Sequence, residues 1–321
     1  MPMLPSSDYQ SPWFLPGGHF QTIVPSLLRK APRVTDEKER LELADGDFLD
    51  LEWCRQEESS RLVILCHGLE ANAGASYVQE LAGVFSRKGW DVLAWSYRGC
   101  SGEMNRLPRF YHSGATEDLA AVVTHAIANH SAKKIDLIGF SMGGNLILKY
   151  LGEQSEEVPS RLNRAVTFSV PCDLACSAGA LDTAFNREIY MRRFIKSLRK
   201  KVREKSLLFP ERLNPDGLEK IRTFREFDTR YTAPLHGFVD AEDYWRSSSS
   251  RPFLEKIRIP TLLVNAENDP FLGPQCYPQA EAEANQCFNL EIPLKGGHVG
   301  FPGRKGDRSW MAERAVRFLS E

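Results

Sequence analysis

Residues 134–145 read KIDLIGFSMGGN, and this stretch indicates the fold more directly than any other part of the chain. Residues 134–138 are predicted to form a strand, and a helical pattern begins at Asn145. Between them lies a G-x-S-x-G pentapeptide, whose outer glycines leave room for a tight turn. A serine in this strand–turn–helix setting stands at a helix N-terminus, which stabilises negative charge. We interpret Ser141 as a candidate nucleophile; the alternative is a small-residue helix start in a nucleotide-type fold.

Strands and helices are predicted to alternate on both sides of this stretch. The predicted strands cover residues 61–66, 91–95, 134–138, 164–169, 260–265 and 288–292. The predicted helices cover residues 76–88, 116–130, 145–153, 274–285 and 309–320. Before them, residues 40–43 and 48–54 flank a turn sequence and are expected to pair as an antiparallel hairpin. This order predicts an α/β fold with a mostly parallel sheet, in which ligands bind beyond the carboxyl ends of the strands.

The remaining segments define the expected domain organisation. Residues 1–35 contain six prolines and are expected to form an extended N-terminal arm, with at most one short helix around residues 22–29. Residues 173–252 interrupt the alternation for too long to be a structureless loop, so we expect a helical cap inserted between two late strands. The core would then comprise residues 36–172 and 253–321.

The composition excludes several classes of protein. The chain has 321 residues, of which 42% are hydrophobic and 26% are charged, and this is typical of a soluble globular protein. Its formal net charge of -1 gives no basic surplus for binding nucleic acid. No apolar run approaches the roughly 20 residues of a bilayer span, and residues 1–10 do not resemble a secretory signal. We therefore expect a cytoplasmic protein without a stable membrane anchor.

The seven cysteines also favour a cytoplasmic location. They are odd in number and scattered, which favours free thiols in a reducing compartment. None of them lies in a C-x-x-C pair, and Cys172 and Cys176 have no second pair of ligands nearby. The sequence therefore predicts neither a metal site nor a bound cofactor.

Two later loops carry the partners that a serine nucleophile needs. A hydroxyl is a weak nucleophile until a base removes its proton. In this type of fold an acid and then a histidine follow the serine along the chain. Asp269 and His298 each follow a late predicted strand, so both should lie at the sheet edge that carries Ser141. His298 would be the base and Asp269 would orient it; Glu267 and Asp173 are the alternative acids if Asp269 is only a helix N-cap.

A third loop, His67-Gly68-Leu69, directly follows the buried strand 61–66. In folds of this type the oxyanion hole takes one backbone N–H from the residue after the nucleophile and one from this loop. We therefore expect Met142 and Leu69 to be the two donors. The other histidines in predicted loops are His19, His112 and His236. We expect them to form structural hydrogen bonds, although each could line the site.

Longer motifs extend along nearly the whole chain. They are LPGGHFQT at 15–22, HGLE at 67–70, YRGCSGE at 97–103, YHSG at 111–114, GFSMGGN at 139–145, TAPLHGF at 232–238 and NDPF at 268–271. On these motifs the chain resembles the α/β hydrolases, and within them the YheT-like esterase branch. The resemblance implies a catalytic triad of Ser141, Asp269 and His298. Members resemble carboxylic-ester hydrolases, some of them acting on short acyl esters, and eukaryotic ones act on phospholipids or transfer acyl groups and often carry an N-terminal anchor.

We therefore expect a serine esterase that cleaves small-molecule esters of short to medium acyl chains through an acyl-serine intermediate. The alternatives are acyl transfer to an alcohol, a lipid esterase, or a hydrolase-fold protein that only binds a partner. We also expect a bacterial protein that acts as a monomer.

One segment of the cap could contact a membrane. Residues 192–205 contain eight basic residues and a stripe of apolar residues at helical spacing. The apolar residues are Phe194, Ile195, Leu198 and Val202. We interpret this segment as a cap helix with a solvated outer face, and the alternative is weak docking onto anionic lipid.

Overall fold

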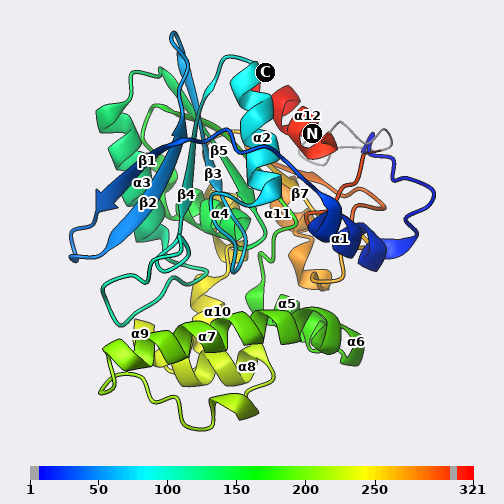
Figure 1. The fold of residues 1–321 in the computed structure, drawn as a ribbon. Helices are drawn as coiled ribbons and strands as arrows, with labels where there is room; N and C mark the ends of the chain where they lie inside the picture. Colours follow the sequence, from blue (N-terminus) through cyan, green and yellow to red (C-terminus); the bar gives the residue numbers. More distant parts are fainter. Residues whose placement is uncertain (1–6, 304–308) are drawn as a thin grey trace.

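The structure is a computed structural model that describes residues 7–303 and 309–321 (Figure 1). In these residues eight strands form one sheet with the order β1-β2-β4-β3-β5-β6-β7-β8. The strands are β1 (Glu37–Glu42), β2 (Phe48–Cys54), β3 (Arg61–Cys66), β4 (Asp91–Ser96), β5 (Lys134–Phe140), β6 (Leu162–Phe168), β7 (Thr261–Val264) and β8 (Phe288–Glu291). β2 pairs antiparallel with both β1 and β4, and the pairs from β4 through β8 are all parallel. The predicted fold class is confirmed.

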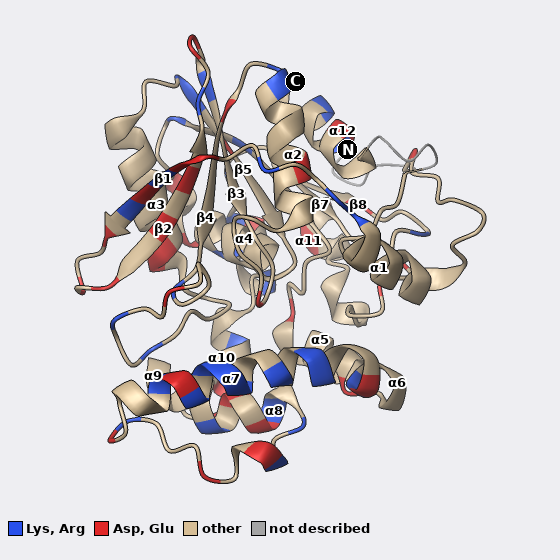
Figure 2. Cartoon of the chain, in the orientation of Figure 1, with Lys and Arg blue, Asp and Glu red and all other residues tan. Residues whose placement is uncertain are grey.

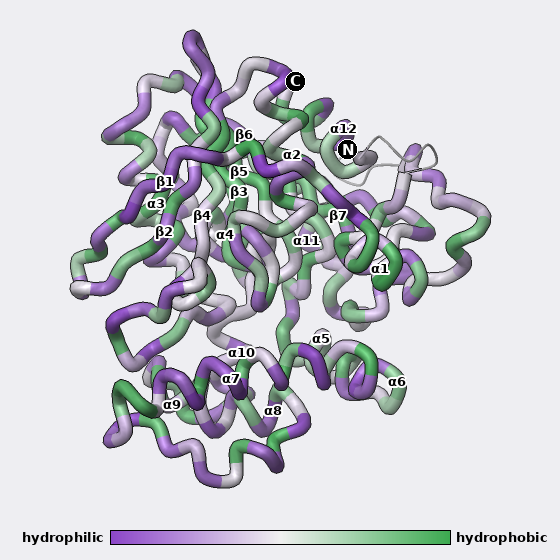
Figure 3. Tube along the Cα trace, in the orientation of Figure 1, coloured by the Kyte–Doolittle hydropathy of each residue, from purple (hydrophilic) through white to green (hydrophobic). Residues whose placement is uncertain are grey.

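Each face of the sheet is covered by helices. α2 (Ser76–Arg87) and α12 (Trp310–Leu319) pack on one face, whereas α3 (Thr116–Asn129), α4 (Met142–Gln154) and α11 (Gln279–Ala284) pack on the other. Successive residues of β3 alternate between the two: Leu62 and Ile64 join one core, and Val63 joins the other. Figure 3 shows the hydrophobic colour concentrated along the central strands. The predicted burial of strand 61–66 on both faces is therefore correct.

The cap lies between β6 and β7 in the chain and forms a separate layer below the sheet in Figure 1. Its helices are α5 (Leu174–Leu181), α6 (Ala184–Asn186), α7 (Arg192–Leu208), α8 (Phe224–Phe227), α9 (Ala233–His236) and α10 (Ala241–Ser248). Met191, Ile195 and Val202 belong to a hydrophobic cluster made largely of cap residues. Because residues 173–252 bury such a cluster, we propose that they form one unit over the core.

The N-terminal arm contains a longer helix than predicted. α1 (Gly17–Leu28) begins five residues before the expected start at residue 22. Gly17 and Gly18 disfavour a helix, which is why the sequence pattern predicted a start only at residue 22. Gln21, Thr22 and Pro25 are buried, so contacts with the rest of the protein stabilise it.

The single helix predicted over residues 274–285 is wrong. The chain there forms a short 3₁₀ turn, Pro274–Cys276, and then α11. Pro278 lies between the two, where it has no N–H for the hydrogen bond that a continuous helix would require.

The basic residues of α7 do not all face solvent. Figure 2 shows basic residues along this helix, and Arg192 and Lys196 among them are exposed. Lys205, however, is fully buried, and its Nζ donates to Asn105 Oδ1 at 2.5 Å. Burial lowers the pKa of Lys205 to about 8. The expected solvated basic face is therefore smaller than the sequence indicated. Within the described residues, no helix combines the length and apolar character that crossing a bilayer requires.

Candidate active site

The G-x-S-x-G turn joins β5 to α4, and Ser141 stands at its apex. Ser141 has φ 52° and ψ −120°, a conformation that a non-glycine residue rarely adopts. A side chain at Gly143 would collide with the carbonyl of Cys66, and one at Gly139 would collide with the turn itself. The glycines therefore let the end of β3 and the start of α4 pack against the turn, and the strained backbone holds the serine at the carboxyl end of β5.

The structure brings the three residues selected from the sequence into one hydrogen-bonded chain. His298 Nε2 lies 3.0 Å from the Ser141 hydroxyl oxygen, and His298 Nδ1 lies 2.8 Å from Asp269 Oδ2. The side chain of Asp269 is 0% exposed and that of His298 is 9% exposed, so the carboxylate that contacts the imidazole is shielded from solvent. The ring of Phe271 stacks on the imidazole at 3.9 Å and covers one of its faces. This geometry allows a proton to pass from the hydroxyl to the imidazole.

The two alternative acids occupy other positions. Asp173 is the N-cap of α5, where its carboxylate accepts from the backbone N–H of Cys176 at 2.8 Å. Glu267 is exposed, and its backbone N–H donates to the carbonyl of Pro293. Of the three candidate acids, Asp269 is the one whose carboxylate contacts His298.

Sequence reasoning about the site did not identify the residues that hold the His298 loop. Thr22 Oγ1 accepts from the backbone N–H of His298 at 2.8 Å, and Gln21 Oε1 accepts from Gly296 at 2.8 Å. Gln21 Oε1 also accepts from Asn268 Nδ2 at 3.0 Å, beside the acid. Thus α1 forms hydrogen bonds with both the loop that carries Asp269 and the loop that carries His298. The LPGGHFQT motif was the signal in the sequence, although nothing local linked it to His298.

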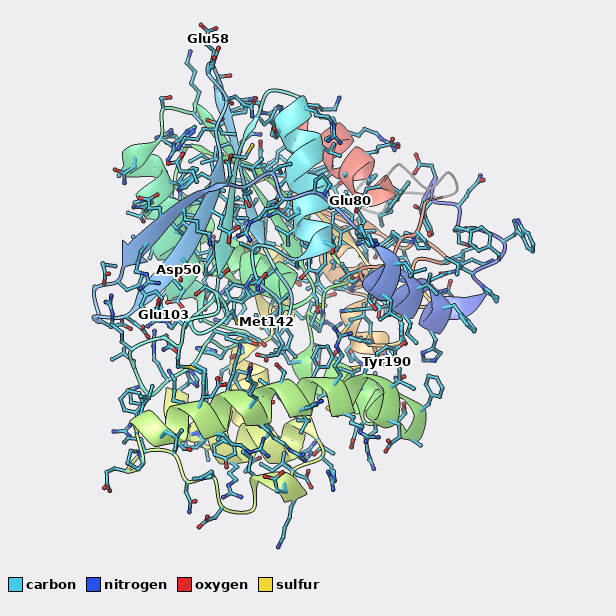
Figure 4. All side chains as sticks on the ribbon, viewed as in Figure 1. Asp50, Glu58, Glu80, Glu103, Met142 and Tyr190 are labelled. Atoms are coloured by element: carbon cyan, nitrogen blue, oxygen red, sulfur yellow. The ribbon has the colours of Figure 1, made fainter. Side chains whose placement is uncertain are left out.

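The two expected oxyanion donors have free backbone N–H groups. In the loop after β3, Gly68 donates to the Tyr77 hydroxyl at 2.9 Å and Glu70 donates to the Tyr111 hydroxyl at 3.1 Å. Within the part of the chain that the structure describes, the N–H of Leu69 between them has no acceptor, and neither has that of Met142. Figure 4 places Met142 between the sheet and the cap. Both N–H groups are therefore available to a ligand oxygen.

A largely apolar pocket opens from Ser141 and His298 and extends under the cap. Residues from both units line it. The lining residues from the cap include Leu174, Ala178, Leu181, Phe194, Leu198 and Trp245. A pocket of this kind binds an apolar ligand segment and leaves the polar end at the serine. Phe194 and Leu198 face it, whereas Ile195 from the same predicted stripe is buried in the cap instead.

The remaining histidines form hydrogen bonds within the fold. Burial lowers the pKa of His67 to about 3, and its Nε2 accepts from the backbone N–H of Tyr97, so the ring is neutral. His19 Nδ1 contacts the Tyr190 hydroxyl at 3.0 Å. His112 and His236 also line the pocket, and burial lowers the pKa of both. His112 and His236 therefore combine the expected structural role with a position in the pocket wall.

Comparison with known proteins identifies the family of this chain. The model of the alpha/beta hydrolase fold family matches residues 61–304, which is more than half of the chain. The esterase Pf2001 of Pyrococcus furiosus superposes with a TM-score of 0.57 at 19% identity, covering 91% of this chain and 98% of that one, and so shares the fold. The chain belongs to the α/β hydrolases.

The similarity to individual sequences is more specific. The Escherichia coli (strain K12) protein named "Putative esterase YheT" is 35% identical over 310 residues, covering 94% of this chain and 90% of that protein. The human Phospholipase ABHD3 is 28% identical over 308 residues, covering 94% and 75%. The Monoacylglycerol lipase of Saccharomyces cerevisiae is 30% identical over 272 residues, covering 82% and 60%. Within the α/β hydrolases, this chain is a member of the YheT-like esterase branch.

Proposed function

We propose that the protein is a serine hydrolase that cleaves carboxylic esters through an acyl-Ser141 intermediate. The hydrogen-bonded chain from Ser141 through His298 to Asp269 carries this proposal, because it joins a nucleophile, a base and an orienting acid at the mouth of an apolar pocket. Relatives named as an esterase, a phospholipase and a lipase support the same reaction class.

The first half of the reaction acylates the serine. His298 Nε2 accepts the hydroxyl proton while Ser141 Oγ attacks the ester carbonyl carbon. The carbonyl oxygen becomes an oxyanion, which the N–H groups of Leu69 and Met142 stabilise, each donor contributing about 3 kcal/mol in the transition state. The intermediate then collapses, and the imidazolium gives its proton to the departing alcohol oxygen.

The second half releases the acid. Water loses a proton to His298 as it attacks the acyl carbon, and the tetrahedral intermediate then expels Ser141, which takes the proton back. Asp269 accepts the Nδ1–H of His298 throughout, which fixes the tautomer and stabilises the imidazolium. No other group is required to balance the proton transfers.

The apolar pocket supports the proposal that the substrate is an ester with a short or medium acyl chain. Its walls include Leu174, Phe194 and Leu198, which offer apolar contact to methylene groups. The alternative acceptor is an alcohol, in which case the protein would transfer the acyl group. We further propose that the protein acts as a monomer, which light scattering after size-exclusion chromatography measures directly.

A second candidate function is ester cleavage at a lipid surface. Trp13 is 91% exposed and Phe14 is 59% exposed, and the outer face of α7 carries exposed Arg192 and Lys196. Exposed aromatic and basic side chains together favour an anionic bilayer surface. Sedimentation with anionic vesicles, in low and high salt, separates this candidate from a plain esterase.

A fluorophosphonate probe and intact mass measurement test the main proposal. We expect one adduct on Ser141, no adduct in the Ser141→Ala variant, and hydrolysis of p-nitrophenyl esters by the unmodified chain alone. A protein that takes no label and cleaves no ester of any chain length would be a binding protein with a hydrolase fold.

A further inference from the structure

Glu70 directly follows Leu69, the candidate oxyanion donor, and its backbone is in the left-handed region with φ 56°. A glutamate seldom adopts this conformation unless its surroundings impose it. The side chain is only 5% exposed, although it is a carboxylate. The contacts that hold Glu70 therefore constrain the loop that carries the N–H of Leu69.

Three side chains donate hydrogen bonds to the Glu70 carboxylate. Tyr111 donates to Oε1 at 2.6 Å, and its oxygen also accepts the backbone N–H of Glu70 at 3.1 Å. Lys201 Nζ donates to Oε1 at 2.8 Å, and the Ser197 hydroxyl donates to Oε2. We call these four residues the Glu70 cluster. Tyr111 belongs to the core, whereas Ser197 and Lys201 lie one turn apart on α7, so the cluster joins the oxyanion loop to the cap.

Lys201 is the counter-ion of this buried carboxylate. Nζ also donates to the Cys100 thiol at 3.1 Å. Burial raises the pKa of Cys100 to about 11, so the thiol stays neutral and does not compete as an anionic partner of Lys201. The Nζ of Lys201 also lies 5.0 Å over the Tyr111 ring. Without Lys201, an unpaired carboxylate would lie one residue from the site where the oxyanion develops, and like charges there repel strongly.

We propose that Lys201 is a positioning residue that fixes the Leu69 N–H in the oxyanion hole by neutralising and holding Glu70. Lys201 lines the pocket but belongs to the cap. The oxyanion hole therefore has its full geometry and charge balance only while α7 contacts the loop that carries Leu69 and Glu70. Movement of α7 away from the core to admit an ester would break two of the three contacts to the carboxylate. Cap closure and completion of the oxyanion hole are therefore one event. This inference rests on the proposed function.

The test compares the wild type with the Lys201→Met variant and with a matched control, Lys200→Met. Lys200 is the preceding residue of α7, with a side chain that is 75% exposed and lies outside the pocket. For each protein we measure kcat and KM with p-nitrophenyl butyrate and the rate of Ser141 labelling by a fluorophosphonate. Thermal unfolding shows whether each variant is folded.

We expect Lys201→Met to lower kcat and the labelling rate by about 10-fold to 100-fold, with KM changed by less than about twofold, because misplaced oxyanion donors act on the transition state. Lys200→Met should match the wild type. The double variant Glu70→Gln/Lys201→Met removes the unpaired charge, so it should recover about tenfold of the lost rate. A packing role for Lys201 alone would give no such recovery.

If Lys201→Met does not fold, Lys201→Gln keeps a donor, removes the charge, and should show the same fall in kcat. Equal rates in the wild type and the Lys201 variant, or a double variant as slow as the single one, would overturn the role of Lys201 alone. A wild type that takes no label and cleaves no ester would overturn the proposed function, and this inference with it.

Discussion

The backbone N–H of His298 donates to the hydroxyl of Thr22 at 2.8 Å, across 276 residues of sequence. Thr22 is 7% exposed, and its hydroxyl also donates to the carbonyl of Gly18 within α1. The N-terminal helix α1 therefore helps to fix the position of the His298 loop relative to Ser141. Although α1 carries none of the three residues of the proposed triad, the reacting geometry depends on it.

Replacing Thr22 with valine should slow the reaction. The variant keeps the shape of the side chain but leaves the His298 N–H without its acceptor, so the imidazole shifts relative to Ser141. We expect kcat to fall by about 10-fold to 100-fold, measured with p-nitrophenyl acetate. Thr22→Ser retains the hydroxyl and should keep kcat within about twofold. Equal loss in both variants would contradict this role of the hydroxyl.

The Asp269→Asn variant should fold normally and lose about 10⁴-fold in kcat, because an amide donates to His298 Nδ1 and favours the wrong tautomer. Asp173→Asn is the matched control, since Asp173 caps α5 and has no contact with the imidazole. Steady-state kinetics of both variants measure the difference. Loss of activity in Asp173→Asn but not in Asp269→Asn would show that the acid is assigned wrongly.

The apolar wall under the cap should control the accepted acyl length. Leu198 lines the pocket, and Leu198→Trp would fill the space beyond the ester. We expect kcat/KM for a p-nitrophenyl octanoate to fall at least tenfold relative to the acetate. Leu207→Trp, on the same helix but 84% exposed, should leave the ratio unchanged. If Leu198→Trp lowers the rates of both esters equally, the acyl chain lies elsewhere.

A buried ion cluster in the core should be important for stability. Arg98 is 2% exposed and binds Asp118 through two hydrogen bonds of 2.7 and 2.8 Å, and its Nη1 lies 2.9 Å from Asp47. Arg98→Met would leave two buried carboxylates with reduced pairing, at a cost of about 3–5 kcal/mol in the free energy of unfolding. Urea denaturation measures it. Arg40→Met, which removes two more exposed ion pairs, should cost less, about 1 kcal/mol.

Asp228 in the cap should make stability depend on pH. Burial raises the pKa of this carboxyl to about 6 from an ordinary value of 3.8, although Thr232 and Trp245 donate hydrogen bonds that lower it. The folded state therefore binds the proton more tightly than the unfolded state. Its contribution to stability is fully present below pH 3.8 and is lost as the pH rises through about 6.

Relative to Asp228→Asn, the wild type should thus lose about 3 kcal/mol of unfolding free energy between pH 3.5 and pH 7. Denaturation curves of the two proteins at a series of pH values give this difference directly. Parallel pH dependences would mean that the carboxyl is ionised at its ordinary pKa in the fold.

The sequence by itself determined the order of strands and helices, and it selected Ser141, Asp269 and His298. The fold could be predicted, and these three candidates could be selected, because each step depends on local pattern and chain order: the G-x-S-x-G turn follows a strand, and the two later loops follow strands whose carboxyl ends must share one sheet edge. The structure accordingly brings the three side chains into hydrogen-bonding distance. Local pattern also suggested Leu69 and Met142 as the oxyanion donors, which stays a prediction.

Only the tertiary structure decided which distant residues support that site and which way the cap helix faces. Thr22 meets His298 across 276 residues, and Lys201 meets Glu70 across 131, so no short stretch of sequence contains either contact. Lys200 and Lys201 are chemically the same in the sequence, yet one is exposed and the other pairs with a buried carboxylate. A basic amphipathic pattern defines a polar face, but the packing partner determines which of its charges the fold buries.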